Sequence, residues 1–76
     1  MNKDNPISVQ DCQKISNLCN KIQNDINKNK SYLLEDQNNL FKLLDNFKGK
    51  YSFLSEHEIV YMFPIPKIVI KRLQLI

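Results

Sequence analysis

The chain carries an apolar residue or cysteine at every seventh position over about half of its length. Counting from Cys12, this first series is Cys12, Cys19, Ile26, Leu33, Leu40 and Phe47. The residues three places after the first five members are Ile15, Ile22, Asn29, Asp36 and Leu43. The two series match the a and d positions of a heptad repeat, whose apolar seam faces a partner helix. The pattern predicts a mainly α chain with one long coiled-coil helix over about residues 9–48.

Both ends of this predicted helix carry local signals. Ser8 is a candidate N-cap, because a serine hydroxyl accepts a hydrogen bond from a free N–H of the first turn. Asp11 follows three residues later, as in a variant of the capping box. Gly49, the only glycine, is able to adopt the left-handed conformation that ends many helices. A 40-residue helix would span about 60 Å, so its seam is expected to be covered by a partner.

A helical hairpin is the alternative arrangement. The polar stretch of residues 27–31 could be a loop, with Ser31 capping a second helix, so that helices 9–26 and 32–48 pack together and a C-terminal strand follows. The stretch contains no glycine or proline, the residues that most often break helices. The heptad phase also continues unbroken from Ile26 to Leu33, and these two facts favour the continuous helix.

Two d positions of the predicted seam are polar, namely Asn29 and Asp36. A polar residue in a coiled-coil seam fixes register and partner number at a cost in stability; alternatively, the helix faces solvent there. Either way the centre of the seam is weak. We therefore expect a hetero-oligomer with another protein rather than a homodimer.

The second half of the chain predicts a short helix and an apolar tail. Ser55 and Glu58 form a capping-box pair, and proline disfavours helix in the residue before Pro64, so a helix over about residues 56–62 is expected. A strand over residues 58–63 is the alternative. Residues 64–76 are predicted to be extended, because β-branched residues at 68–70 favour a strand over a short helix.

An uncovered apolar strand is an aggregation hazard, so the tail needs a cover. It could fold back on the helix as part of a self-contained α+β domain, or join a sheet of a partner. Few polar residues alternate along it, which favours a partner. The residues predicted to dock are Phe63, Ile65, Ile68, Ile70 and Leu73.

No arrangement of residues indicates catalysis, a cofactor or a metal site. The single histidine, His57, lies between two glutamates, as expected of a solvated first helical turn. The two cysteines are one heptad apart, about 10.5 Å along a helix axis, which is too far for a disulfide. There is no secretory signal and no apolar run of membrane-spanning length, so an intracellular protein is expected.

The charge of the chain leaves one alternative function open. The net charge is +3 and the pI is about 9.0, and Lys67, Lys71 and Arg72 lie together in the tail. A small basic regulator that binds nucleic acid, or inhibits an enzyme acting on it, is therefore the second hypothesis.

The favoured hypothesis is a non-enzymatic assembly subunit in a single domain. It would pair with another helix through its heptad seam and dock its tail on a partner. The residues predicted to form the seam are Cys12, Ile15, Cys19, Ile22, Ile26, Leu33, Leu40, Leu43 and Phe47.

Overall fold

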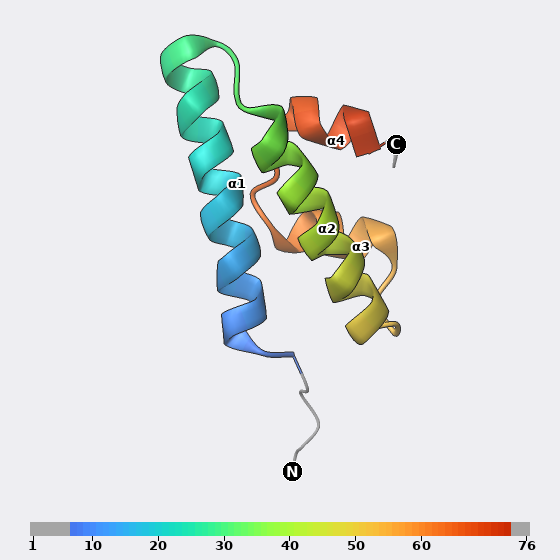
Figure 1. The fold of residues 1–76 in the computed structure, drawn as a ribbon. Helices are drawn as coiled ribbons and strands as arrows, with labels where there is room; N and C mark the ends of the chain where they lie inside the picture. Colours follow the sequence, from blue (N-terminus) through green and yellow to red (C-terminus); the bar gives the residue numbers. More distant parts are fainter. Residues whose placement is uncertain (1–6, 74–76) are drawn as a thin grey trace.

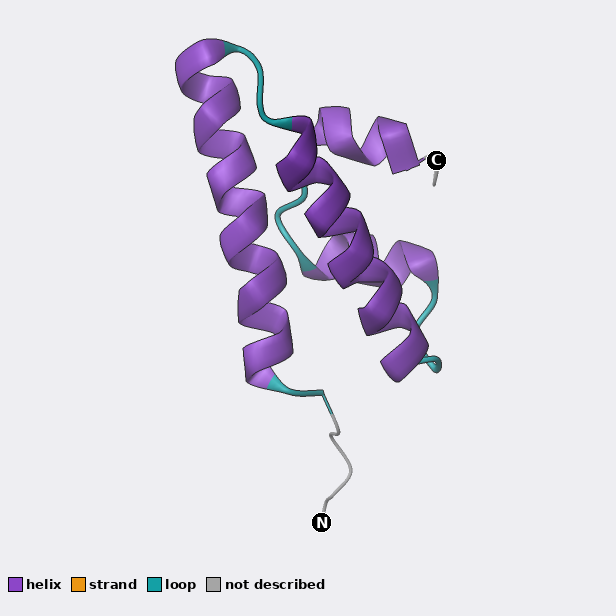
Figure 2. Ribbon diagram, in the orientation of Figure 1, coloured by secondary structure: helices purple, strands orange, loops and turns teal. Residues whose placement is uncertain are grey.

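The computed structural model of the chain describes residues 7–73, with the backbone alone described at Leu73. Four helices follow one another in this part: α1 (Val9–Asn29), α2 (Leu34–Lys50), α3 (Glu56–Met62) and α4 (Lys67–Leu73). The two long helices α1 and α2 form an antiparallel hairpin, and α3 and α4 lie behind α2 (Figure 1). Helices and loops account for all of residues 7–73, with no strand among them (Figure 2). The expectation of a mainly helical chain is therefore confirmed.

The prediction of one continuous helix over residues 9–48 is wrong. Helix α1 ends at Asn29, where Lys30 adopts the left-handed conformation (φ 59°, ψ 18°) and donates its N–H to the carbonyl of Ile26. The chain is then extended through Leu33, whose carbonyl accepts hydrogen bonds from the first turn of α2. The hairpin alternative matches the observed pair of helices in outline, with α1 three residues longer than expected. Its expected cap is wrong: α2 begins at Leu34, and Leu33 rather than Ser31 is its N-cap, without a side-chain hydrogen bond.

The physical reason for the break is that the hairpin buries the apolar stripe within the chain itself. The polar d position Asp36 accounts for part of this arrangement, because it is buried and accepts a hydrogen bond from Lys21 across the hairpin. Tyr32 donates its hydroxyl hydrogen to the side chain of Gln37 and so fastens the loop to α2. These contacts require the two halves of the stripe to face one another.

The observed ends of α1 and α2 agree only in part with the capping signals predicted from the sequence. Ser8 is the N-cap of α1 and its hydroxyl accepts from the N–H of Asp11, as predicted. Gly49, by contrast, does not end α2, because no glycine has a positive φ and the helix continues to Lys50. Tyr51 ends it instead, since its buried ring packs against Phe47 with ring centroids 4.6 Å apart.

The short helix expected over residues 56–62 is confirmed as α3. Its capping box is complete: the Ser55 hydroxyl accepts from the Glu58 N–H, and the Glu58 carboxylate accepts from the Ser55 N–H. These two bonds satisfy backbone donors that the first turn of a helix otherwise leaves unpaired. The helix ends at Met62, two residues before Pro64.

The prediction of an extended tail is wrong for its described part, because Lys67–Leu73 forms α4. Pro66 precedes this helix, and its carbonyl accepts from the N–H groups of Val69 and Ile70. The fixed φ of proline suits the start of a helix, and two cations in the last turn suit its dipole. These local effects, with the burial of Val69, outweigh the strand preference of the β-branched run; residues 74–76 lie outside the described part.

The core lies where the hairpin meets the C-terminal segment. The buried ring of Phe47 packs against Tyr51 and makes an edge-on contact with Phe63, with ring centroids 5.4 Å apart. The buried apolar side chains come from every helix and from the link between α3 and α4; they are Ile15, Cys19, Ile22, Leu40, Leu44, Phe47, Tyr51, Ile59, Phe63, Ile65 and Val69.

Candidate functional site

The residues predicted to form the seam lie mostly in the core of this chain. Ile15, Cys19, Ile22, Leu40 and Phe47 are buried, and Cys12, Ile26 and Leu43 are half-buried against them. Leu33 is the exception, because it precedes α2 and its side chain is 58% exposed. The seam therefore faces the other helices of its own chain, and its pairing with a second protein stays a prediction.

The residues predicted to dock the tail divide into two groups. Phe63 and Ile65 are buried in the core and Ile70 is half-buried, whereas Ile68 is 43% exposed. The side chain of Leu73 lies outside the described residues. Four buried core residues are not among the predicted seam and docking residues; they are Leu44, Tyr51, Ile59 and Val69. Leu44 lies four residues after Leu40, and Tyr51 lies four residues after Phe47.

Cys19 is fully buried, and Cys12 is half-buried one heptad earlier on the same helix. Both are free thiols. Removal from water disfavours the thiolate and raises the pKa of Cys19 from 9.0 to about 11. Because the thiolate is the reactive form, the packing protects Cys19 from chemical modification.

We expect a thiol-specific reagent at pH 8 to modify Cys12 first. A pKa of about 11 in place of 9.0 lowers the thiolate fraction of Cys19 roughly a hundredfold, and burial blocks access as well. The measurement is the modification rate of the Cys12→Ser and Cys19→Ser variants, each of which keeps one thiol, in native buffer and in denaturant. Equal native rates would contradict the packing of Cys19; in denaturant the two rates should converge.

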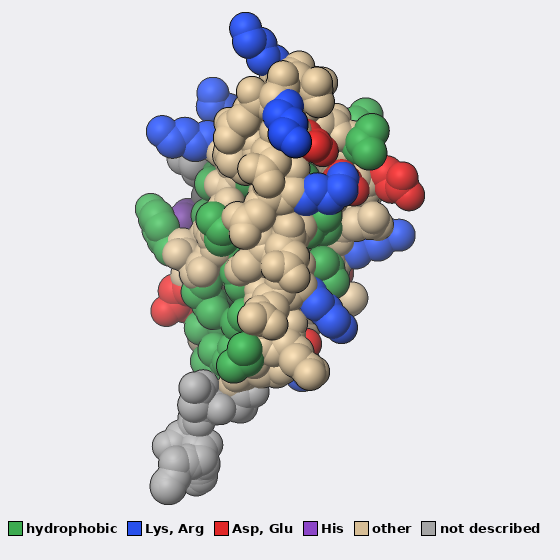
Figure 3. Space-filling view, turned by 90° about the vertical axis from the view of Figure 1, so that its left-hand side faces the viewer, with side chains coloured by type: hydrophobic (Ala, Val, Ile, Leu, Met, Phe, Trp, Pro, Cys, Tyr) green, Lys and Arg blue, Asp and Glu red, His purple; other side chains and the backbone are tan. Residues whose placement is uncertain are grey.

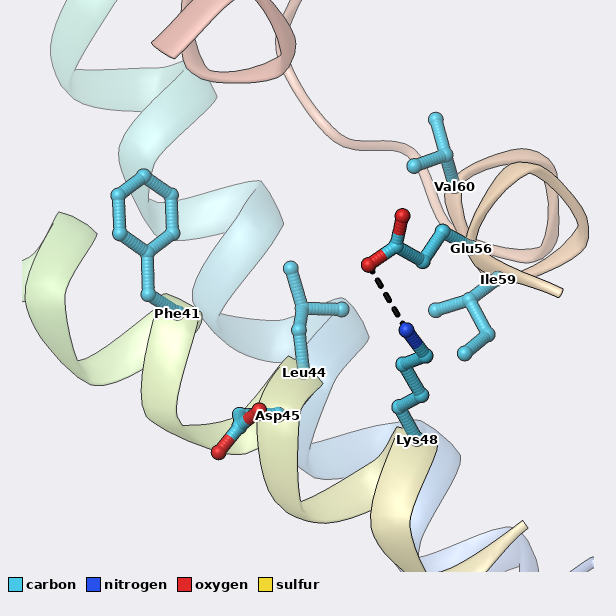
Figure 4. A pocket seen from close by; sticks show the side chains of 7 residues that line it. All are labelled: Phe41, Leu44, Asp45, Lys48, Glu56, Ile59 and Val60. Carbon is cyan, nitrogen blue, oxygen red and sulfur yellow. Dashed lines mark hydrogen bonds and ion pairs between the residues drawn. The ribbon is translucent and has the colours of Figure 1, made fainter. Parts of the chain in front are cut away.

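A groove between α2 and α3 is the clearest hollow on the described surface. Leu44 and Ile59 form its buried floor, and Phe41 and Val60 stand half-buried on opposite sides of its mouth (Figure 4). Its volume is about 170 Å³. A dry cavity of about 150 Å³ holds one benzene molecule, so the groove is large enough for one apolar side chain and too small for a typical cofactor.

One end of this groove is bridged by an ion pair. Lys48 on α2 and Glu56 on α3 are 2.8 Å apart, and this hydrogen bond lowers the pKa of Glu56 (Figure 4). Both side chains are about half exposed, so the pair contributes little to the stability of the fold. Asp45 lies on the outer side of α2 and, within residues 7–73, has no ion-pair partner. The groove thus combines an apolar floor with one free carboxylate at its rim.

A second hollow, between the start of α1 and the end of α2, is occupied by polar contacts of the chain itself. Lys50 and the hydroxyl of Tyr51 both donate to Asp11, at 2.9 and 2.7 Å, and the same hydroxyl accepts from the N–H of Ser8. The Lys50 ammonium, followed by the Tyr51 hydroxyl, holds the pKa of Asp11 below its usual value. These groups satisfy one another and join the two helices, so this hollow is a structural contact.

Residues 7–73 contain no group of three or more His, Cys, Asp and Glu side chains that could hold a metal ion. None of the helices in that range has the length and apolar character needed to cross a membrane. The chain matches no protein-family model, no curated protein and no solved structure.

Proposed function

We propose that the chain is a non-enzymatic protein-binding module that receives one apolar side chain of a partner helix in the α2–α3 groove. The observation that carries the proposal is the open mouth between Phe41 and Val60 above a buried floor. This keeps the assembly role expected from the sequence and moves the contact from the heptad seam, whose side chains lie mostly in the core of the chain, to the groove. Such grooves bind amphipathic helices through a few apolar anchors.

The charge at the rim of the groove limits which class of partner helix fits it. The Lys48–Glu56 pair is internally neutral, whereas Asp45 is free within the described part of the chain. A partner helix with a lysine or arginine one turn from its apolar anchor would place a cation near this carboxylate. The partner class is therefore a basic amphipathic helix with a leucine- or phenylalanine-sized anchor.

The test places a photoreactive phenylalanine analogue at position 41, in the mouth of the groove, or at the neighbouring exposed position 42 as a control. In cells that make the chain, we expect a partner protein to be crosslinked to the analogue at position 41 and not to the analogue at position 42. The purified partner should then bind Val60→Glu and the groove-filling Val60→Phe about fivefold or more weakly, because an anchor residue contributes at least about 1 kcal/mol.

Tyr61→Glu is the matched control, because Tyr61 follows Val60 on α3 and is 86% exposed. It should leave the affinity within about threefold, a difference under about 1 kcal/mol. Circular dichroism of each variant checks that the helices are retained. Equal losses for Val60→Glu and Tyr61→Glu, or the absence of a crosslink specific to position 41, would contradict the proposal.

A further inference from the structure

The net charge of the protein is concentrated in one half of the fold. Helix α4 carries three cations and no carboxylate. Residues 21–30 contain three lysines and one aspartate, a net charge of +2, which the two acidic residues at 35 and 36 cancel. The remaining described charges are four lysines and four carboxylates, which also cancel: Asp11, Lys14, Lys42, Asp45, Lys48, Lys50, Glu56 and Glu58. Residues 7–73 therefore carry +3, and it comes from the half that contains the α1–α2 loop and α4.

Most cations of this half have no ion-pair partner within residues 7–73. The exception is Lys21, which is shared between Asp25 and Asp36. In the neutral half Lys48 and Lys50 are paired with carboxylates. Lys14 and Lys42 of that half have no ion-pair partner within residues 7–73. The cations without an ion-pair partner in residues 7–73 that belong to this half form the basic end, defined as Lys28, Lys30, Lys67, Lys71 and Arg72. In Figure 3 the Lys and Arg side chains at the very top and at the upper left stand apart from acidic side chains, whereas those lower on the same face lie beside them.

One aromatic contact connects the two segments of the basic end. The guanidinium carbon of Arg72 lies 6.0 Å from the ring centre of Tyr32, which is itself held by its hydrogen bond to Gln37. This cation–π contact brings α4 next to the α1–α2 loop and positions the guanidinium without neutralising it. A planar cation beside a tyrosine, among lysines, is the combination that proteins use to contact the backbone and bases of single strands.

We propose that the basic end binds single-stranded nucleic acid, through phosphate contacts of the lysines and stacking on the Arg72–Tyr32 pair. An anionic membrane surface is the competing ligand, and the burial of α4 disfavours it. Membrane-surface helices need a free apolar face, whereas Val69 is fully buried and Ile70 is half-buried. This site is separate from the α2–α3 groove, so its test does not depend on the proposed protein-binding role.

The experiment measures binding of the whole chain to a fluorescent 20-nucleotide oligo(dT) by anisotropy, beside a duplex of equal length and vesicles containing phosphatidylserine. Three to five phosphate contacts on a single strand predict a 20- to 100-fold loss of affinity between about 50 and 200 mM salt. Lys71→Glu combined with Arg72→Glu should weaken binding tenfold or more and reduce the slope of log K against log salt by about 1.4.

The matched control is Lys14→Glu combined with Lys42→Glu, which changes the net charge by the same amount in the neutral half. It should change the affinity by less than about threefold, since long-range charge effects are screened at these salt concentrations. Equal losses in the two double variants would overturn the proposal by showing a net-charge effect. Tighter binding to the duplex, binding to the vesicles alone, or no binding to oligo(dT) would overturn it as well.

Discussion

Replacing Leu40 with alanine should lower the free energy of unfolding by about 3 kcal/mol, within the range of large-to-small substitutions in protein cores. Leu40 is fully buried between the helices of the hairpin, so the substitution removes apolar contacts and leaves a cavity. A domain of 76 residues has a total stability of roughly 4–11 kcal/mol. The loss is therefore a quarter or more of the total and is measurable by urea unfolding followed by circular dichroism.

Leu33→Ala is the matched control, because Leu33 and Leu40 are successive a positions of the heptad pattern. In a continuous coiled-coil helix both would lie in the seam and both substitutions would be costly. In the hairpin Leu33 is 58% exposed at the start of α2, so its replacement should change stability by about 0.5 kcal/mol or less. Similar losses for the two variants would contradict the hairpin and restore the long helix.

The features that were predicted from the sequence rest on short-range signals. Helix α3 was expected with its bounds because the Ser55–Glu58 capping box and Pro64 act within one or two turns. The cap at Ser8 was found in the same way. The heptad series identified most of the hairpin core, because an apolar stripe marks the buried face whichever helix covers it.

The break between α1 and α2 had no comparable local signal. Lys30 takes the left-handed conformation that glycine or asparagine usually occupies, and the heptad phase happens to continue across the loop. The break is decided by contacts between residues far apart in sequence, such as Lys21 with Asp36. The α2–α3 groove was unpredictable for a related reason, since Phe41 and Val60 face one another only after the turn at residues 51–55 has placed α3 against α2.

In the tail, the strand propensity of the residues conflicts with the packing that buries Val69. Its β-branched residues favour a strand, yet the fully buried Val69 lies four residues after the buried Ile65 and six after Phe63. Within residues 7–73 no other strand is present for it to pair with. A helix satisfies its backbone hydrogen bonds locally and still buries Val69. In its described part, the apolar tail is thus covered by folding back on its own chain. The sequence favoured the other alternative, in which a partner covers the tail.

Val69→Asp should therefore unfold most of the protein or reduce its stability by about 3–5 kcal/mol, since an unpaired charge would replace a fully buried apolar side chain. Thermal and urea unfolding of the variant would measure the loss. Ile68→Asp is the neighbouring control: both positions lie in the first turn of α4, where a carboxylate suits the helix dipole equally. Because Ile68 is 43% exposed, its replacement should cost about 1 kcal/mol or less.

The comparison of these two variants decides what the tail is for. If Val69→Asp destabilises the isolated chain and Ile68→Asp does not, α4 is part of the domain and its cations are held in place for the basic end. If both variants unfold at the same denaturant concentration as the unmodified chain, Val69 is not buried in solution. The tail would then be free to dock on a partner, and the positions of Lys71 and Arg72 beside the α1–α2 loop would lose their structural basis.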